Sequence, residues 1–187
     1  MGGMHGFGAL VFDQHESGFH HAWEGRVWAM SSAVMARTTI DRFRFVIEQM
    51  PPAAYLASSY YERWLWAIEY LAAEQRLFDG ADTTAVVIRP SPDVALWEGR
   101  FHSGERVRVA NRVTADHCRV PRYLRRAEGR IEWLACAWPN PTASAATGTY
   151  GKAELVYTVA FNAADLFGPS ADHTVTADLA ESDLETA

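Results

Sequence analysis

The sequence LVYTVAF at residues 155–161 is the strongest predicted strand in the second half of the chain. It is dominated by β-branched and aromatic side chains, which favour a strand in a packed sheet. Further strand-like stretches occur at residues 106–109, 129–134 and 173–177. Several short strands at this spacing predict a small β-barrel or sandwich over residues 101–187, which ends in an acidic tail.

The first half of the chain has a helical period instead. Over residues 23–77, apolar side chains recur three and four positions apart, which is the spacing of one helix face. The first predicted helix has its apolar positions at Trp23, Val27, Met30 and Val34. A second helix is predicted to start at Thr38 and to end at the prolines of positions 51–52. A third is predicted to begin with a capping box at residues 59–62 and to run to about Leu77.

The remaining segments show no regular period. Residues 1–22 are rich in glycine and histidine, and we expect them to form an N-terminal arm. Residues 78–100 are expected to connect two domains, and a loop is expected from Pro139. The sequence thus predicts an α+β protein: an arm, a helical domain over residues 23–77, a connector, and a C-terminal β domain over residues 101–187.

Composition narrows the class of protein. The 187 residues are 49% hydrophobic and 21% charged, which is typical of a globular protein. A net charge of −6 argues against a nucleic-acid partner. No apolar run approaches the roughly 20 residues of a membrane helix, and the N-terminus lacks the basic start of a signal peptide. The two cysteines, Cys118 and Cys136, fit a reducing compartment, so a cytoplasmic location is expected.

Histidine and cysteine residues predict no metal site on this chain. The arm holds His15, His20 and His21, whose spacing matches no metal motif, and a site needs three or four well-placed ligands. His102 and His117 are isolated in the sequence, and we expect both at the surface or in turns. Cys118 follows His117 directly, but a catalytic Cys–His pair meets in space rather than in sequence. Cys136 lies in an apolar stretch and is expected to be buried and inert.

Arginine carries nearly all of the positive charge. Lys152 is the only lysine among 17 basic residues. Arg44 lies between two phenylalanines on the flank of an apolar helix face, and Arg119 opens the stretch RVPRYLRR. These arginines are either solvated surface charge or guanidinium forks that bind an anion.

An aromatic group in the third predicted helix also has two interpretations. Tyr61 and Trp64 belong to the apolar stripe and are expected in the core. Tyr60 and Trp66 fall off the stripe and are candidates for a pocket or an interface.

Several blocks in order along the chain are similar to the β subunit of nitrile hydratase. The most specific block is YLASSYYERW at residues 55–64. The other blocks are residues 2–8, 23–26, 41–51, 104–107, 117–123, 157–161, 165–168 and 178–181. The resemblance therefore covers nearly the whole chain, although the connector is shorter than in many members of the family.

The resemblance implies an SH3-like β-barrel after the helical domain, and a lyase that hydrates small nitriles to amides. It also implies a partner α subunit, in a heterodimer or heterotetramer, that holds low-spin Co(III) or Fe(III) through backbone nitrogens and three cysteines, two of them oxidised. The two β-subunit arginines that contact the oxidised sulfurs correspond to Arg44 and Arg119, and the arm is expected to wrap the partner. The residues implied at the substrate pocket are Ile40, Tyr60, Tyr61 and Trp64.

Three alternatives stay open from the sequence. Thiocyanate hydrolase resembles the same architecture, but there the two halves are separate polypeptides. An activator or metallochaperone for the α subunit resembles the helical half only, so the β domain and Arg119 argue against it. A free SH3-like adaptor without enzymatic activity leaves the helical blocks unexplained.

Overall fold

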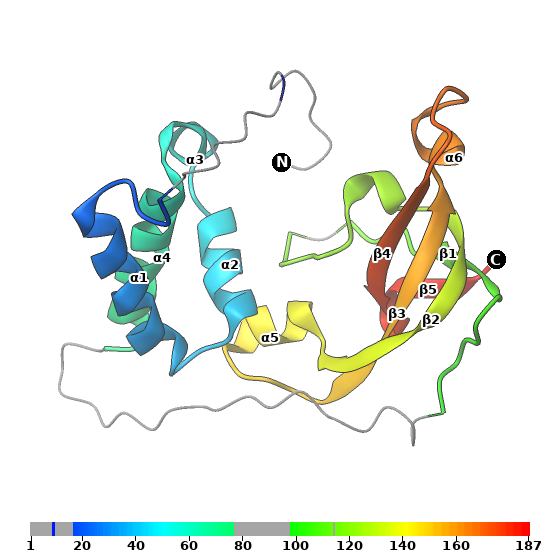
Figure 1. Ribbon diagram of the computed structural model, residues 1–187. Coiled ribbons are helices and arrows are strands. Elements are labelled where there is room, and N and C mark those ends of the chain that lie inside the picture. Colours follow the sequence, from blue (N-terminus) through cyan, green and yellow to red (C-terminus); the bar gives the residue numbers. More distant parts are fainter. Residues whose placement is uncertain (1–8, 10–16, 77–97, 114) are drawn as a thin grey trace. The chain divides into compact units, whose positions relative to one another are not determined.

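The computed structural model describes residue 9 and residues 17–76, 98–113 and 115–187, which form helices and one antiparallel sheet (Figure 1). They fall into two compact units. One contains four helices together with residues 144–149, and the other contains the five strands. The predicted α+β class is confirmed. The predicted arm and connector lie mostly outside the described residues. Within the described ranges, no helix has the length and apolar character needed to cross a membrane.

The helical unit consists of three longer helices and one short helix. They are α1 (Ala22–Met35), α2 (Ile40–Glu48), α3 (Pro52–Ala57) and α4 (Tyr60–Glu74). Its core comes from the apolar faces of α1, α2 and α4: Val27, Val34, Phe43, Val46, Ala67, Ile68 and Leu71. The short helix α3 is not predicted by the sequence pattern. It forms because Pro52 takes the first helical position, where the missing N–H of proline costs no hydrogen bond.

Side-chain caps fix where two of these helices begin. The Thr39 hydroxyl accepts a hydrogen bond from the Arg42 amide at 3.1 Å, so the cap of α2 is Thr39 rather than the predicted Thr38. The predicted capping box of α4 is confirmed, because the Ser59 amide donates to the Glu62 carboxylate at 2.6 Å and the Glu62 amide donates to the Ser59 hydroxyl. These caps hold α2 and α4 at the ends that carry the candidate site.

The second unit is an antiparallel sheet in the order β4-β3-β2-β1-β5. Its strands are β1 (Arg106–Val109), β2 (Glu128–Pro139), β3 (Ala153–Asn162), β4 (Thr174–Ala180) and β5 (Leu184–Thr186). The four predicted strands are confirmed, although β2 is longer than the pattern indicates. β5 lies in the acidic tail and is set by its pairing with β1 rather than by its own sequence. Short helical turns connect the strands: η3 (Arg122–Leu124), α6 (Ala163–Phe167) and η4 (Glu181–Asp183).

The sheet curls strongly, because its two edge strands are consecutive in the chain. β4 and β5 lie at opposite edges, and only η4 joins them. In a flat sheet of this order the edges would lie about 19 Å apart, at about 4.8 Å per strand. The chain from Ala180 to Leu184 reaches at most about 14 Å. The sheet therefore bends around its own core.

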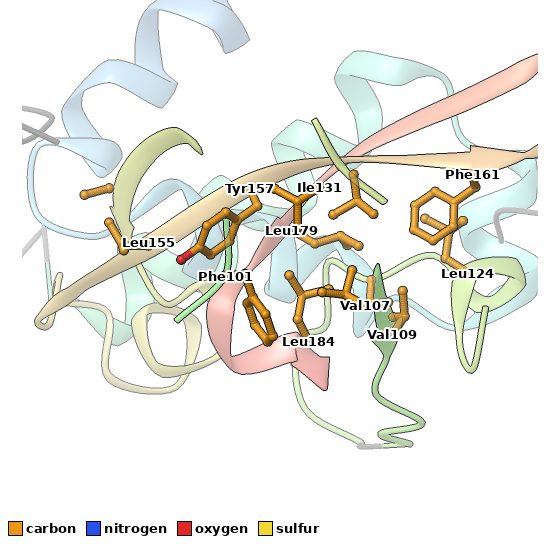
Figure 2. Packing of buried hydrophobic residues seen from close by; sticks show 13 residues of the cluster. Phe101, Val107, Val109, Leu124, Ile131, Leu155, Tyr157, Phe161, Leu179 and Leu184 are labelled. Carbon is orange, nitrogen blue, oxygen red and sulfur yellow. The ribbon is translucent and has the colours of Figure 1, made fainter. Parts of the chain in front are cut away.

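The concave side of the curled sheet holds that core. Figure 2 shows Phe101, Ile131, Tyr157, Leu179 and Leu184 packed together, and each of them is buried. The Phe101 and Tyr157 rings meet edge to face with centroids 5.8 Å apart. The Tyr157 hydroxyl donates a hydrogen bond of 2.6 Å to Glu181, so the one polar atom of this ring has a partner.

A helix replaces the loop that is predicted after Pro139. α5 (Pro141–Thr147) begins with a proline, and its Ser144 and Ala145 are buried. The Thr39 hydroxyl donates to the Ser144 carbonyl at 3.0 Å. This contact holds residues 144–149 against the start of α2. The small side chains of this segment give no helical pattern, so packing selects the helix.

Candidate functional site

A cavity of about 250 Å³ in the helical unit contains four of the predicted site residues. They are Ile40, Arg44, Tyr60 and Trp64. The other residues that line it are Phe43, Ile47, Tyr55 and Arg63. The walls come from α2, α3 and α4, so three consecutive helices build one pocket.

The α2 wall follows directly from helical spacing. Ile40, Phe43, Arg44 and Ile47 stand at positions i, i+3, i+4 and i+7, which lie on one face of a helix. Phe43 is buried and belongs to the helical core, whereas Arg44 is exposed. One side of this α2 face therefore packs in the core through Phe43, and the other side places the charged Arg44 at the pocket.

Arg44 has a guanidinium that is only loosely engaged within the chain. Its Nη1 atom lies 4.0 Å from Asp41 Oδ1, and its side chain is 47% exposed. Arg42, two residues earlier, is engaged instead: it forms an ion pair with Glu74 and lies 3.5 Å from the Ala145 carbonyl. Because a guanidinium has five N–H donors, Arg44 keeps donors for an acceptor from outside the chain.

Aromatic rings form the opposite wall. The Trp64 ring lies 5.4 Å from the Tyr60 ring and 5.3 Å from the Phe43 ring, measured between centroids. Tyr60 is 60% exposed and Trp64 is half-buried. Trp64 thus packs on the core and faces the pocket, which agrees with both interpretations of this residue.

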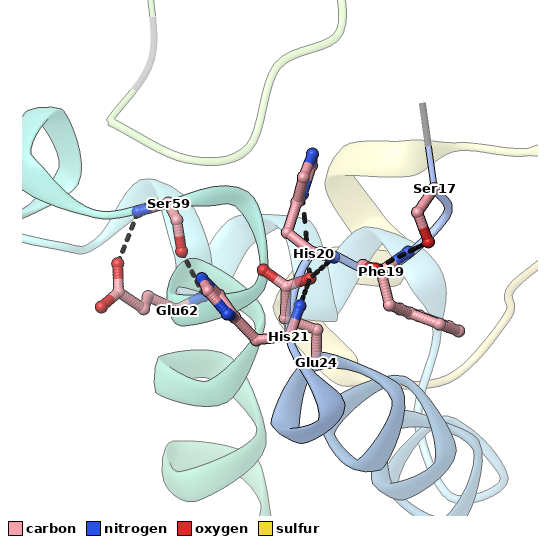
Figure 3. Close-up of polar contacts among 7 residues, drawn as sticks. All are labelled: Ser17, Phe19, His20, His21, Glu24, Ser59 and Glu62. Atoms are coloured by element: carbon pink, nitrogen blue, oxygen red, sulfur yellow. Dashed lines mark hydrogen bonds and ion pairs between the residues drawn. The ribbon is translucent and has the colours of Figure 1, made fainter. Parts of the chain in front are cut away.

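Tyr61 does not line this cavity. Its ring lies 5.5 Å from the Phe19 ring, and it borders a second hollow beside the start of α1. There the buried Glu24 carboxylate accepts hydrogen bonds from the His20 and His21 amides (Figure 3). Tyr61 thus faces a different hollow from Trp64, although its ring lies 5.9 Å from the Trp64 ring and 5.1 Å from the ring of Tyr60, which lines both hollows.

Two residues of this pocket, Tyr55 and Arg63, are not singled out by any pattern in the sequence. Arg63 donates from Nε to the Tyr55 carbonyl at 3.0 Å and from Nη2 to the Ser58 carbonyl at 2.8 Å. Its guanidinium carbon also lies 4.1 Å from the centre of the Tyr55 ring. The only sequence signal for them is their place in the block at residues 55–64.

Arg119 lies in the sheet unit, at a cavity of about 230 Å³. Residues of β2, β3 and β4 line this cavity, together with the segment around Arg119. The lining side chains with polar or ionisable groups include Cys118, Cys136, Asn140, Glu154, Asp178 and Asp183. The Thr142 hydroxyl donates to the His117 carbonyl at 2.7 Å, which fixes the backbone two residues before Arg119. Arg119 itself is exposed.

The electrostatics of this cavity are dominated by burial. Desolvation, with a smaller contribution from Asp178, raises the pKa of the Cys136 thiol, so the thiol stays protonated near neutral pH. Burial and the neighbouring Glu154 carboxylate raise the pKa of Asp183, against a smaller opposing effect of Arg112. The expectation that His117 lies at the surface is wrong, because the residue is fully buried. Its segment packs inward beneath the exposed Arg119.

Metal ligands do not gather in the described parts of either unit. Among the described residues, no three or more histidine, cysteine, aspartate or glutamate side chains lie close enough together to hold a metal ion. What both cavities share is an exposed arginine beside aromatic or apolar side chains.

These features define an α+β chain with an exposed arginine at each of two cavities. The chain belongs to the nitrile hydratase β-subunit family. The family model "Nitrile hydratase beta subunit, N-terminal" matches residues 1–107, and the model "Nitrile hydratase beta subunit, C-terminal" matches residues 91–186.

Two relatives that are nitrile hydratase β subunits agree with this assignment. A nitrile hydratase subunit beta of Pseudomonas putida is 32% identical, and the alignment covers 100% of this chain and 97% of that protein. A "low-molecular weight cobalt-containing nitrile hydratase subunit beta" of Rhodococcus rhodochrous is 28% identical over 94% of this chain and 92% of that protein. The solved apo-enzyme of thiocyanate hydrolase from Thiobacillus thioparus matches with a TM-score of 0.44 and 28% identity, over 48% of this chain and 78% of that chain.

Proposed function

We propose that this chain is the β subunit of a nitrile hydratase, a lyase that adds water to small nitriles and releases amides. In this proposal an α subunit holds the metal, a non-corrin Co(III) or Fe(III), and forms a heterodimer or heterotetramer with this chain. Family membership over both parts of the chain supports the assignment, and the cobalt in the name of a relative supports the metal. The free thiols Cys118 and Cys136 favour a reducing compartment, so the proposal places the enzyme in the cytoplasm.

The observation that carries the proposal is the position of Arg44. Its loosely paired guanidinium opens into the same cavity as Ile40, Tyr60 and Trp64. Those are the residues that the family resemblance implies for arginine recognition and substrate binding.

The chemistry of a guanidinium suits the role we propose for Arg44 and Arg119. Oxidised cysteine ligands carry sulfenate or sulfinate oxygens, which are anionic acceptors, and each arginine donates N–H bonds to such oxygens of the partner. These contacts hold the ligands in place and tune the metal. When bound by the partner, the metal supplies Lewis-acid activation of nitrile or water.

The apolar side chains have a separate task in this proposal. Ile40, Tyr60 and Trp64 surround the hydrocarbon part of the nitrile and exclude bulk water, as the lining of a small-molecule pocket does. Tyr61 remains a proposed substrate residue, and its contact with Phe19 would let it act from the neighbouring hollow. The two aromatic rings of Tyr60 and Tyr61, with centroids 5.1 Å apart, link the two hollows.

We extend the proposal to the fold of the sheet unit, which we assign as an SH3-like barrel. The support is its strand order, together with the turn η4 that brings the chain from one edge strand to the other. Closing the sheet would remove two exposed edges, which is the usual advantage of a barrel.

Lysine substitution tests the roles of the two arginines. In the purified complex with the α subunit, Arg44→Lys and Arg119→Lys should each lower kcat about 10–100-fold, as loss of a contact to a metal ligand typically does. An ammonium keeps the charge but lacks the fork. Native mass spectrometry should show an intact complex for both variants. Arg26→Lys, an exposed arginine of α1, is the matched control and should keep full activity. Unchanged turnover in the Arg44 variant contradicts the assignment.

A further inference from the structure

We propose that Arg63 is a positioning residue that holds the Tyr55 ring as one wall of the Arg44 pocket, and so limits the nitrile to a compact apolar one. This inference rests on the proposed function for the identity of the ligand. The placement of Tyr55 by Arg63 is independent of it. Both residues line the cavity of about 250 Å³, on the side formed by α3 and α4.

α3 is a short and exposed helix. The helix has six residues, none of them buried, and a helix this short is not stable by itself. The Pro51 carbonyl accepts from the Tyr55 amide, and the Ala54 carbonyl accepts from the Ser58 amide and hydroxyl, so these bonds lie within the segment itself.

The side chain of Arg63 in α4 reaches this segment through two hydrogen bonds. Its two N–H bonds go to the Tyr55 and Ser58 carbonyls, at 3.0 and 2.8 Å, near the end of α3 where carbonyls lack helical partners. The guanidinium also stacks on the Tyr55 ring at 4.1 Å. The fork therefore fixes both the backbone and the ring of Tyr55 relative to α4.

The size of the pocket sets the ligand class. Apolar cavities of about 150 Å³ accommodate benzene. By the same ratio of volume to ligand size, a cavity of about 250 Å³ fits an aliphatic or single-ring nitrile closely, and we expect two fused or linked rings to bind less well. If the Tyr55 wall moved, the pocket would open along α3 and accept the larger class.

Hydrogen exchange tests the positioning on the chain itself. In Arg63→Lys, the amides of residues 55–58 should exchange at least about tenfold faster than in the wild type, while the interior amides of α4 stay unchanged. Tyr55→Phe keeps the ring and the carbonyl, so it should exchange at the wild-type rate. Unchanged exchange in Arg63→Lys overturns the positioning role, whatever reaction the protein catalyses.

Substrate selectivity tests the consequence in the complex with the α subunit. The probes are benzonitrile and 2-naphthonitrile. Arg63→Lys and Tyr55→Ala should each lower the ratio of kcat/KM for benzonitrile over naphthonitrile about tenfold, mainly through KM, while Tyr55→Phe keeps the wild-type ratio. An unchanged ratio in both variants, with an active wild type, overturns the size limit. A wild-type complex that hydrates neither these nitriles nor the aliphatic propionitrile overturns the size limit together with the proposed function, and the exchange result then stands by itself.

Discussion

Arg42, Arg44 and Arg63 lie within 22 residues of one another but have different contacts. These contacts decide which guanidinium keeps donors for an acceptor from another molecule. Arg42 is bound to Glu74, and Arg63 is bound to two backbone carbonyls. Arg44 has one long ion pair of 4.0 Å and faces a pocket. Their positions in the sequence look alike, and only the contacts show that Arg44 has donors to offer.

One buried tyrosine, Tyr157, makes the stability of the protein depend on pH. Burial, followed by the hydrogen bond to Glu181, raises the pKa of Tyr157 to about 12. The folded state therefore disfavours tyrosinate. The contribution of neutral Tyr157 to the unfolding free energy is complete below about pH 10 and is lost as pH rises through about 12. The unfolding free energy of the wild type should fall relative to that of Tyr157→Phe across this range.

Urea unfolding at several pH values between about 8 and 12 measures this difference. Other tyrosines and arginines titrate equally in both proteins, so they cancel in the comparison. A difference that stays constant with pH contradicts the assigned shift, and one that grows in favour of the wild type contradicts its sign.

At the scale of elements, α2 depends on one threonine for its start. The Thr39 hydroxyl caps the Arg42 amide and donates to the Ser144 carbonyl, and the residue is buried. Thr39→Val keeps the shape and loses both bonds, which should destabilise the protein by about 1–2 kcal/mol. Thr39→Ser keeps the hydroxyl and should stay within about 0.5 kcal/mol of the wild type.

Chemical denaturation of both Thr39 variants and the wild type provides the check. Because α2 presents Ile40 and Arg44 to the pocket, Thr39→Val is also expected to raise KM in the complex with the α subunit. Equal midpoints for the Val and Ser variants would show that the cap does not hold α2.

The sequence predicts those helices and strands whose local pattern of side chains is sufficient to define them. Alternation and β-branching locate β1 to β4, and the capping box locates the start of α4. α5 and β5 depend on contacts with distant segments, with Thr39 and with β1 respectively, and carry no local signal. The burial of His117 is missed for the same reason.

The candidate site likewise contains residues that the sequence predicts and residues that it does not. Arg44, Tyr60 and Trp64 are found through the family blocks, and the structure places all three at one cavity. The Arg63–Tyr55 contact is missed because it runs through backbone carbonyls of α3, a helix that the sequence does not predict. Side-chain patterns do not report contacts of this kind.

At the scale of the whole molecule, the chain consists of a helical unit and a curled sheet unit, each with its own core and its own arginine cavity. Neither unit brings together metal ligands among the residues described. A chain with two arginine sites and family membership in an enzyme subunit is expected to act only with its partner.

Co-expression with its α subunit, in medium that contains cobalt and iron, tests whether this chain is the β subunit of a metalloenzyme. We would purify through a tag on this chain and measure native mass, metal content and conversion of nitrile to amide. We expect a stable complex with about one metal per α subunit and amide as product. A metal-free monomer, a chain that leaves the α subunit once the metal is loaded, or full activity of the α subunit alone would contradict it, and would favour an adaptor or an activator instead.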